Sequence, residues 1–311
     1  MLIRRIGLLC CLSILPSRQP SPAAVVQKLQ AGEPALEWAD VDVSADIEYL
    51  DAGRKEKLDL YRPRSGAPRQ RYPGIVVIHG GGWKGGRKGD KREQNIAYSL
   101  ARSGYVCASI DYRLSRFGDP PSWPQALFDC KSAVQFLRRF ADRYQIDPDR
   151  IGVIGGSAGG HLALMVGLTD PAANLEPPSP YAGVPSRVQA VVDLYGPTNL
   201  LTWQWDQIPE IVPLLLGASR SKDPALWTSA SPVHYVTSDD PPVLMLHGTE
   251  DSAVPVDQSR ELRSKLVEKG VRHHLEVIEK AEHSFDLQPP QKDLRPLVIG
   301  FFNTHLKKAK E

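Results

Sequence analysis

The chain has 311 residues, of which 41% are hydrophobic and 24% are charged, and its formal net charge at pH 7 is +2. These values are ordinary for a globular protein that buries a sizeable core, in one large domain or two. They exclude the strong positive field that a nucleic-acid-binding chain carries over its surface.

Residues 1–23 have the pattern of a secretory signal peptide. Arg4 and Arg5 precede an apolar run of ten residues, and small residues follow up to Ala23. The run is too short to span a bilayer, so no stable membrane insertion is expected. We predict cleavage after Ala23, a linker over 24–37, and a secreted or periplasmic protein.

Two other interpretations of this N-terminal segment stay open. The apolar run could remain attached as a helix. Cys10 or Cys11 could instead carry a lipid anchor, but such a signal places a small residue before its cysteine, and Leu9 is not small.

The charge of the mature chain argues against a nucleic-acid partner. Cleavage removes three arginines and no acidic residue, so the formal charge changes from +2 to −1. A local basic cluster remains, and we interpret it as a solvated face of a loop and a helix because acidic residues interrupt it. Its basic members are Lys84, Arg87, Lys88, Lys91 and Arg92, and the interrupting residues are Asp90 and Glu93.

Two cysteines lie in the predicted mature chain, Cys107 in an apolar strand and Cys130 in a helical stretch. A disulfide between them is compatible with an exported protein, and two buried free thiols are compatible with the same positions. The chain contains no Cys/His cluster with metal-ligand spacing, so no metal or cofactor is predicted.

The first predicted elements are two antiparallel strands. The stretches 47–50 and 58–61 alternate apolar and polar residues on either side of 53–55, which predicts a hairpin. The character changes at 74–79, a continuous apolar run that is typical of a strand buried on both faces of a sheet.

Further buried strands then alternate with helices to the end of the chain. The strands are predicted at 105–110, 151–154, 188–194, 243–247 and 273–278, and the helices at 95–102, at 124–143, after Ser157, at 256–269 and at 294–307. This alternation predicts one α/β domain over 38–311, with a mostly parallel central sheet, helices on both faces, and antiparallel N-terminal edge strands. Catalytic groups in such sheets lie beyond the carboxyl ends of the strands.

Two stretches interrupt the alternation. Residues 170–187 are rich in proline, and 196–240 carry three tryptophans, Trp203, Trp205 and Trp227. An insertion of this length after a strand is typical of a lid or a substrate wall over the site. An excursion that only packs on the core is an equally good interpretation.

The nucleophile is predicted at Ser157. It is the centre of the G-x-S-x-G sequence 155–159, which lies between the strand 151–154 and a helix-compatible stretch. A serine at the tip of a sharp strand-to-helix turn needs glycines on both sides, because side chains there would clash with the strand and the helix. The helix N-terminus favours negative charge that develops at this position.

A serine hydroxyl needs a base, and the base needs an acid that holds its tautomer. In this strand order the acid and then the histidine follow the serine, each just after a strand end. Asp251 has the first of these places and is the predicted acid, in preference to Glu250 and Asp257. His283 has the second and is the predicted base. His247, at a strand end, is expected to hydrogen-bond locally.

Backbone amides are predicted to hold the oxyanion. Ala158 follows the nucleophile, and Gly81 and Gly82 belong to the sequence HGGGW at 79–83, just after the first buried strand. Successive glycines let the backbone turn its N–H groups toward a substrate at close range. Four aromatic residues are predicted to line the substrate pocket: Trp83, Tyr195, Trp203 and Trp205.

These motifs together resemble the α/β-hydrolase esterases and lipases with an HGGGW sequence, and most of all the acetyl-xylan/feruloyl esterase-like (BD-FAE) group of carboxylesterases. The matching motifs span about residues 45–305 in the family's order: 79–83, 108–113, 147–151, 155–160, 194–197, 247–255 and His283. The resemblance implies the nucleophile at Ser157, the acid at Asp251, the base at His283 and oxyanion donors at Gly81, Gly82 and Ala158.

The sequence departs from this family at two places. Glu282 stands where many relatives have glycine before the histidine, and the insertion 196–240 makes it unsafe to transfer a substrate by analogy. We predict a secreted serine esterase that acts through an acyl-serine on short-chain or carbohydrate-linked (acetyl or feruloyl) esters. A serine peptidase or amidase of the prolyl-peptidase type would use the same three residues, and a non-catalytic binding protein could use the same fold.

Overall fold

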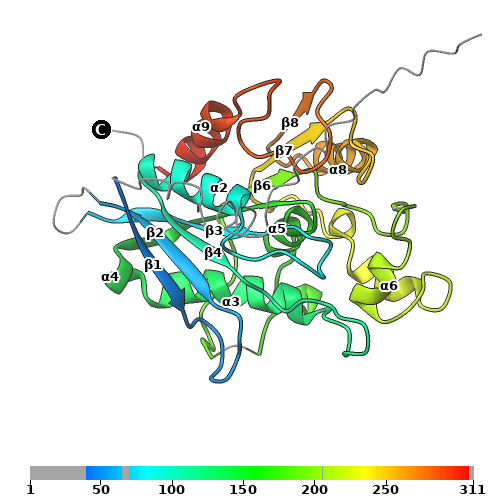
Figure 1. The fold of residues 1–311 in the computed structure, drawn as a ribbon, viewed down its shortest axis with the longest axis horizontal. Coiled ribbons are helices and arrows are strands. Elements are labelled where there is room, and N and C mark those ends of the chain that lie inside the picture. The colour runs from blue at the N-terminus through cyan, green and yellow to red at the C-terminus, as the bar shows by residue number, and fades with distance from the viewer. Residues whose placement is uncertain (1–39, 65–69, 179, 205, 308–311) are drawn as a thin grey trace, which may run out of the picture. The chain divides into compact units, whose positions relative to one another are not determined.

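The computed structural model describes residues 40–64, 70–178, 180–204 and 206–307. The predicted signal peptide 1–23 and linker 24–37 lie outside the described residues, as does Trp205. The chain from Ala39 to Glu311 forms one compact unit (Figure 1). The boundaries of the signal peptide, linker and domain stay predictions.

A single sheet of eight strands organises this unit, in the spatial order β1-β2-β4-β3-β5-β6-β7-β8. The strands are β1 Val41–Ile47, β2 Leu58–Pro63, β3 Tyr72–Ile78, β4 Val106–Ile110, β5 Ile146–Gly156, β6 Ala190–Leu194, β7 Val243–Gly248 and β8 His273–Ile278. The β1–β2 and β2–β4 pairs are antiparallel, and every pair from β4 to β8 is parallel. The predicted mostly parallel sheet with antiparallel N-terminal edge strands is confirmed.

Helices cover both faces of the sheet. On one face lie α2 Lys91–Arg102 and α9 Arg295–Leu306, and on the other lie α3 Gln125–Arg139, α5 Ala158–Leu168 and α8 Asp257–Glu268. Figure 1 shows α2 and α9 on one side of the strands and α3 on the other. The remaining helical elements are α4 Ala141–Tyr144, α6 Ile211–Leu216, α7 Pro224–Ser229 and the short 3-10 turns Pro171–Ala173 and Pro232–His234.

The central strands are apolar on both sides because both sides are covered. In β3, Val76 and Ile78 pack into the core beneath α3 and α5, whereas Ile75 and Val77 pack into the core beneath α2 and α9. Successive side chains of a strand point to opposite faces, so a strand between two helix layers needs an apolar residue at every position. This requirement explains the continuous apolar runs in the sequence.

The first strand differs from its predicted place. The hairpin prediction put it at 47–50, but β1 ends at Ile47 and a loop follows to β2. Asp46 adopts a φ of 57°, and the register of the β1–β2 pair shifts between Ser44 and Ile47. Tyr49 is fully buried, and its hydroxyl donates to the carbonyl of Asp111, so it anchors the loop rather than extending the strand.

Cys107 and Cys130 are free, buried thiols. Cys107 lies in β4 and packs into the core beneath α2 and α9, whereas Cys130 lies in α3 on the other face. Burial raises the pKa of both thiols. Of the two interpretations that the sequence left open, the structure has the free thiols.

The insertion 196–240 contains α6, α7 and the turn Pro232–His234, so it is partly helical in the part described. Its role as a lid stays a prediction. No helix among the described residues has the length and apolar character that crossing a membrane requires.

Candidate active site

Ser157 lies at the turn between β5 and α5. Its φ of 57° is in the left-handed region, and its amide donates to the carbonyl of Leu194 at 2.8 Å. A Cβ added to Gly155 would lie 2.2 Å from the carbonyl oxygen of Gly159, and one added to Gly159 would lie 2.2 Å from the carbonyl oxygen of Ile78. Both glycines are therefore required, because backbone passes too close for any side chain.

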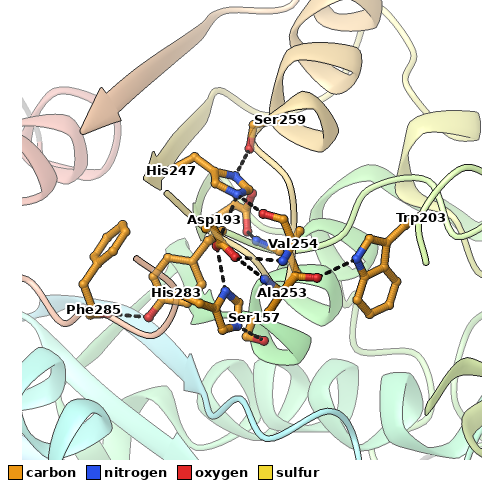
Figure 2. Close-up of polar contacts among 12 residues, drawn as sticks. Ser157, Asp193, Trp203, His247, Ala253, Val254, Ser259, His283 and Phe285 are labelled. Atoms are coloured by element: carbon orange, nitrogen blue, oxygen red, sulfur yellow. Dashed lines mark hydrogen bonds and ion pairs between the residues drawn. The ribbon is translucent and has the colours of Figure 1, made fainter. Parts of the chain in front are cut away.

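His283 joins Ser157 to Asp251. Its Nε2 lies 2.9 Å from Oγ of Ser157 (Figure 2). Its Nδ1 lies 2.7 Å from Oδ2 of Asp251. The carboxylate is an acceptor, so Nδ1 carries the proton and Nε2 is free to accept the serine proton. Three residues from the ends of β5, β7 and β8 thus form one hydrogen-bonded chain, as their positions in the sequence predicted they would meet.

The surroundings of Asp251 keep it ionised. Its side chain is fully buried, and Oδ1 accepts the amides of Ala253 at 3.0 Å and Val254 at 2.8 Å. Burial by itself raises the pKa of a carboxyl group, but hydrogen bonds from His247 and His283 outweigh it and hold the pKa of Asp251 well below its ordinary value. A buried anion next to Nδ1 of His283 is suited to stabilise a protonated imidazole.

Of the three predicted oxyanion donors, Gly82 and Ala158 line the same pocket as Ser157. Gly81 lies one residue away, at the start of a turn in which its carbonyl accepts the amides of Lys84 and Gly85. Gly81 and Gly82 have φ values of 104° and 60°, which glycine adopts without strain. The glycine loop therefore runs along one side of the serine pocket.

The pocket beside Ser157 is small and mostly apolar. Its cavity volume is about 10 Å³. Its lining residues are Gly82, Trp83, Ser157, Ala158, Pro197, Trp203, Ala253, Val254 and His283. Apolar walls around one reactive hydroxyl and one histidine are the usual composition of a small-molecule site.

The predicted pocket aromatics divide into two groups. Trp83 and Trp203 are buried, line the pocket and contact each other edge to face at 6.0 Å. The indole N–H of Trp83 donates to Nδ1 of His161 at 3.3 Å. That of Trp203 donates to the carbonyl of Ala253 at 2.9 Å (Figure 2), so both rings are fixed. Tyr195 does not reach the pocket: it is fully buried and packs edge-on against the far side of the site, against the His283 ring, at 4.9 Å.

The interpretation of residues 84–92 as a solvated face is wrong for two of its members. Lys88 is mostly buried and pairs with Asp46 at 2.8 Å and Asp59 at 2.7 Å. Arg92 is mostly buried against Glu93, with Nη2 2.6 Å from its carboxylate. The local sequence carries no signal for the burial of Lys88, because Asp46 and Asp59 lie elsewhere in the chain.

Glu282 fits before His283 although relatives of this type often have glycine there. It is exposed, and the left-handed backbone in this loop falls at Lys280 and Ser284, with φ values of 60° and 71°. A side chain at 282 therefore meets neither a steric nor a conformational obstacle.

The chain is similar to a known protein family and to curated proteins. A family model described as BD-FAE matches residues 58–266. The chain is 32% identical over 258 residues to the probable carboxylic ester hydrolase LipM of Mycobacterium tuberculosis, and the match covers 80% of this chain and 58% of that protein. The chain thus spans less than two thirds of the length of the curated relatives it matches.

Solved structures resemble the fold over most of the chain. A truncated carbohydrate esterase from gut microbiota has a TM-score of 0.76 at 25% identity, over 86% of this chain and 97% of that one. Esterase Est2 of the Planctomycetes species Thermogutta terrifontis, with propionate bound, has a TM-score of 0.71 at 25% identity, over 88% of this chain and 98% of that one. With the sheet order above, these likenesses confirm the predicted α/β-hydrolase fold.

Proposed function

The chain belongs to the BD-FAE family of α/β-hydrolases, and from this premise we propose that it is a carboxylic-ester hydrolase with Ser157 as its nucleophile. The observation that carries the proposal is the position of His283, within hydrogen-bond distance of both Ser157 and Asp251. The names of the relatives support it, since LipM is a probable carboxylic ester hydrolase.

The proposed reaction has two halves. In the first, Nε2 of His283 takes the proton of Ser157 as Oγ bonds to the ester carbonyl carbon, and the alcohol leaves with that proton. In the second, His283 takes a proton from water, the hydroxide attacks the acyl-serine, and the acid leaves as Ser157 recovers its proton. Asp251 holds the imidazole and stabilises its charged form in both halves.

Backbone amides would stabilise the oxyanion of each tetrahedral intermediate. We assign this role to the amides of Gly82 and Ala158, which border the serine pocket, together with that of Gly81. Ala158 is the first residue of α5, so its amide is not used within the helix, and the helix dipole adds to its effect. Loss of one such donor typically slows a reaction by about 10²–10³-fold.

The size of the pocket favours a short acyl group. Sites for drug-sized ligands measure roughly 300–1,000 Å³, whereas this pocket has a cavity volume of about 10 Å³ and is walled by Trp83 and Trp203. An acetyl group fits such a space better than a feruloyl group. Similarity to a gut carbohydrate esterase supports an acetylated sugar or polysaccharide as the substrate.

Hydrolysis of p-nitrophenyl acetate by wild type and Ser157→Ala tests the proposal. Wild type should turn over the ester and be labelled at Ser157 by a fluorophosphonate probe, and the variant should do neither. Ser264→Ala, on the exposed side of α8, is the matched control and should behave as wild type. Activity retained by Ser157→Ala would remove the proposal.

We further propose that the chain is exported and that residues 1–23 are removed. The apolar run after Arg4 and Arg5 supports this. Expression of the full chain in a bacterial host, followed by N-terminal sequencing of the exported protein, tests it: a start at Ala24 is expected, and an intact Met1 in the exported fraction would contradict it.

A further inference from the structure

A buried ion pair lies beside the proposed site, at the start of α2. Nε and Nη2 of Arg92 donate to the same carboxylate oxygen of Glu93, at 2.8 and 2.6 Å. The side chains are only 17% and 2% exposed. The remaining nitrogen of the guanidinium, Nη1, donates to the hydroxyl of Tyr195 at 3.1 Å.

The guanidinium of Arg92 also touches both glycine turns of the site. A Cβ added to Gly80, in the HGGGW loop, would lie 2.8 Å from Nη2. A Cβ added to Gly156, directly before Ser157, would lie 3.0 Å from Nη1. The side chain therefore occupies space that the two glycines leave open, between the predicted oxyanion loop and the serine turn.

Tyr195 carries this contact to the histidine loop. Its hydroxyl accepts from Arg92 and donates to the carbonyl of Phe285, two residues after His283. A phenol has one proton to donate, so the hydrogen bond from Arg92 directs that proton to Phe285. The Tyr195 ring packs edge-on against the rings of His283 at 4.9 Å and Phe285 at 4.5 Å.

The loop that receives this contact has a strained backbone. Ser284, between His283 and Phe285, has a φ of 71°. A non-glycine residue adopts such a conformation at a cost in free energy, and the conformation persists where its surroundings hold it. The carbonyl of Phe285, the residue after Ser284, accepts from the hydroxyl of Tyr195, which holds this part of the loop.

We infer that Arg92 is a positioning residue for His283 and acts through the hydroxyl of Tyr195. The pair keeps the 283–285 loop in the conformation that sets the imidazole between Ser157 and Asp251. The sequence predicted Tyr195 to be a substrate-binding residue. In this inference Tyr195 instead supports His283 from behind. This inference rests on the proposed function, because its readout is turnover by Ser157.

The variant Tyr195→Phe tests the inference, because it removes the hydroxyl and keeps the ring. We expect kcat for p-nitrophenyl acetate to fall about tenfold or more, since small displacements of a catalytic group are costly, with KM within twofold of wild type. Neither Tyr195 nor Arg92 lines the pocket, so substrate binding should not change. A role limited to stability would lower the melting temperature without this split.

Tyr105→Phe is the matched control. Tyr105 is also fully buried, and its hydroxyl donates to Asn303 at 2.8 Å, far from the site in the α2–α9 layer. Its variant should lose stability as Tyr195→Phe does and keep the wild-type kcat. Fluorophosphonate titration to completion gives the number of folded sites, so that kcat is stated per site for every variant.

Arg92→Lys supplies a second, independent arm. An ammonium keeps the charge beside Glu93 but cannot bond the carboxylate and the phenol in the fork geometry of a guanidinium. We again expect a lower kcat with KM within twofold of wild type. The double variant should be no slower than the slower single variant, because both substitutions act through one contact. If Tyr195→Phe does not fold, Arg92→Lys is judged by the same criterion.

A wild-type kcat in folded Tyr195→Phe and Arg92→Lys would overturn the inference. Failure of the proposed function gives a different pattern, in which the wild-type chain is itself inactive or Ser157→Ala remains active.

Discussion

Nε2 of His247 lies 3.4 Å from Oδ2 of Asp251, the oxygen that also accepts from His283. The same nitrogen donates to the carbonyl of Val254 at 2.7 Å, and Nδ1 accepts from the hydroxyl of Ser259 at 2.7 Å (Figure 2). His247 thus holds the Asp251 loop from within, and its local hydrogen bonding matches the expectation from its place at a strand end. Asp251 is consequently fixed in position as well as in charge.

The fixed carboxylate of Asp251 predicts a large loss of activity in Asp251→Asn. The amide N–H of asparagine donates to Nδ1 of His283, so the ring proton moves to Nε2, which can then no longer accept the proton of Ser157. We therefore expect kcat to fall about 10⁴-fold. The measurement is kcat on p-nitrophenyl acetate at pH 7.5. Asp257→Asn, an exposed carboxylate at the start of α8, is the control and should retain full activity. Similar losses in both variants would contradict this role for Asp251.

The buried His161 predicts a loss of stability in mild acid. Burial lowers its pKa to about 4, although the carbonyl of Ala230 partly opposes this. The unfolded histidine titrates near 6.5, so between these values the unfolded chain binds the extra proton. The contribution of His161 to the free energy of unfolding is therefore complete above pH 6.5 and is lost as the pH falls toward 4.

The size of this effect at pH 5 is about 2 kcal/mol, by proton linkage between the two pKa values. His161→Gln keeps a donor for Ala230 and an acceptor for Trp83 but does not titrate. Urea unfolding at pH 7.5 and pH 5.0 should give a smaller decrease in the free energy of unfolding for the variant than for wild type, by that amount. Equal decreases would show that His161 is not held neutral by burial.

We predict that the indole of Trp203 limits the length of the acyl chain that the enzyme accepts. It lines the serine pocket and also a second hollow, whose other walls are Gln204, Pro209, Ile211, Val212, Pro213, Arg220 and Trp227. Trp203→Ala would join the two spaces, and each methylene buried there contributes about 0.8 kcal/mol. We expect kcat/KM for p-nitrophenyl octanoate to rise at least tenfold relative to acetate.

Trp227→Ala is the control for this change, because Trp227 lines the outer hollow and is not among the residues that line the serine pocket. Its acyl-chain profile should be that of wild type. An unaltered preference for acetate in Trp203→Ala would mean that the indole does not limit the acyl group.

Alanine substitution at two helical glycines is expected to have opposite effects on stability. In α5, Gly159→Ala would place Cβ 2.2 Å from the Ile78 carbonyl, so helix and strand must separate, and we expect little folded protein. In α9, Gly300 meets no atom within 4 Å, and Gly300→Ala should stabilise the fold by roughly 0.5–1 kcal/mol, because alanine is the better helix former. Thermal unfolding of both variants measures this, and a stable Gly159→Ala would be inconsistent with the close approach of α5 to β3.

Much of the fold and of the site was predictable from local patterns. Residues 75–78 are apolar at every position, which is typical of a strand covered on both faces, and the alternation of such runs with helices predicts a parallel sheet. Strand ends of a parallel sheet meet at one edge, so Ser157, Asp251 and His283 could be named from their places after β5, β7 and β8. The structure then brings them within hydrogen-bond distance.

The tertiary structure alone decided which polar groups are buried and what they contact. Arg92 and Tyr195 are 103 residues apart, and no local pattern says that a basic helix residue will meet a phenol behind the base. Cys107 and Cys130 remain thiols because the sheet lies between them, which follows from packing and not from spacing. Periodicity along the chain records whether a side chain meets water or core, whereas the identity of its partner depends on how distant segments pack.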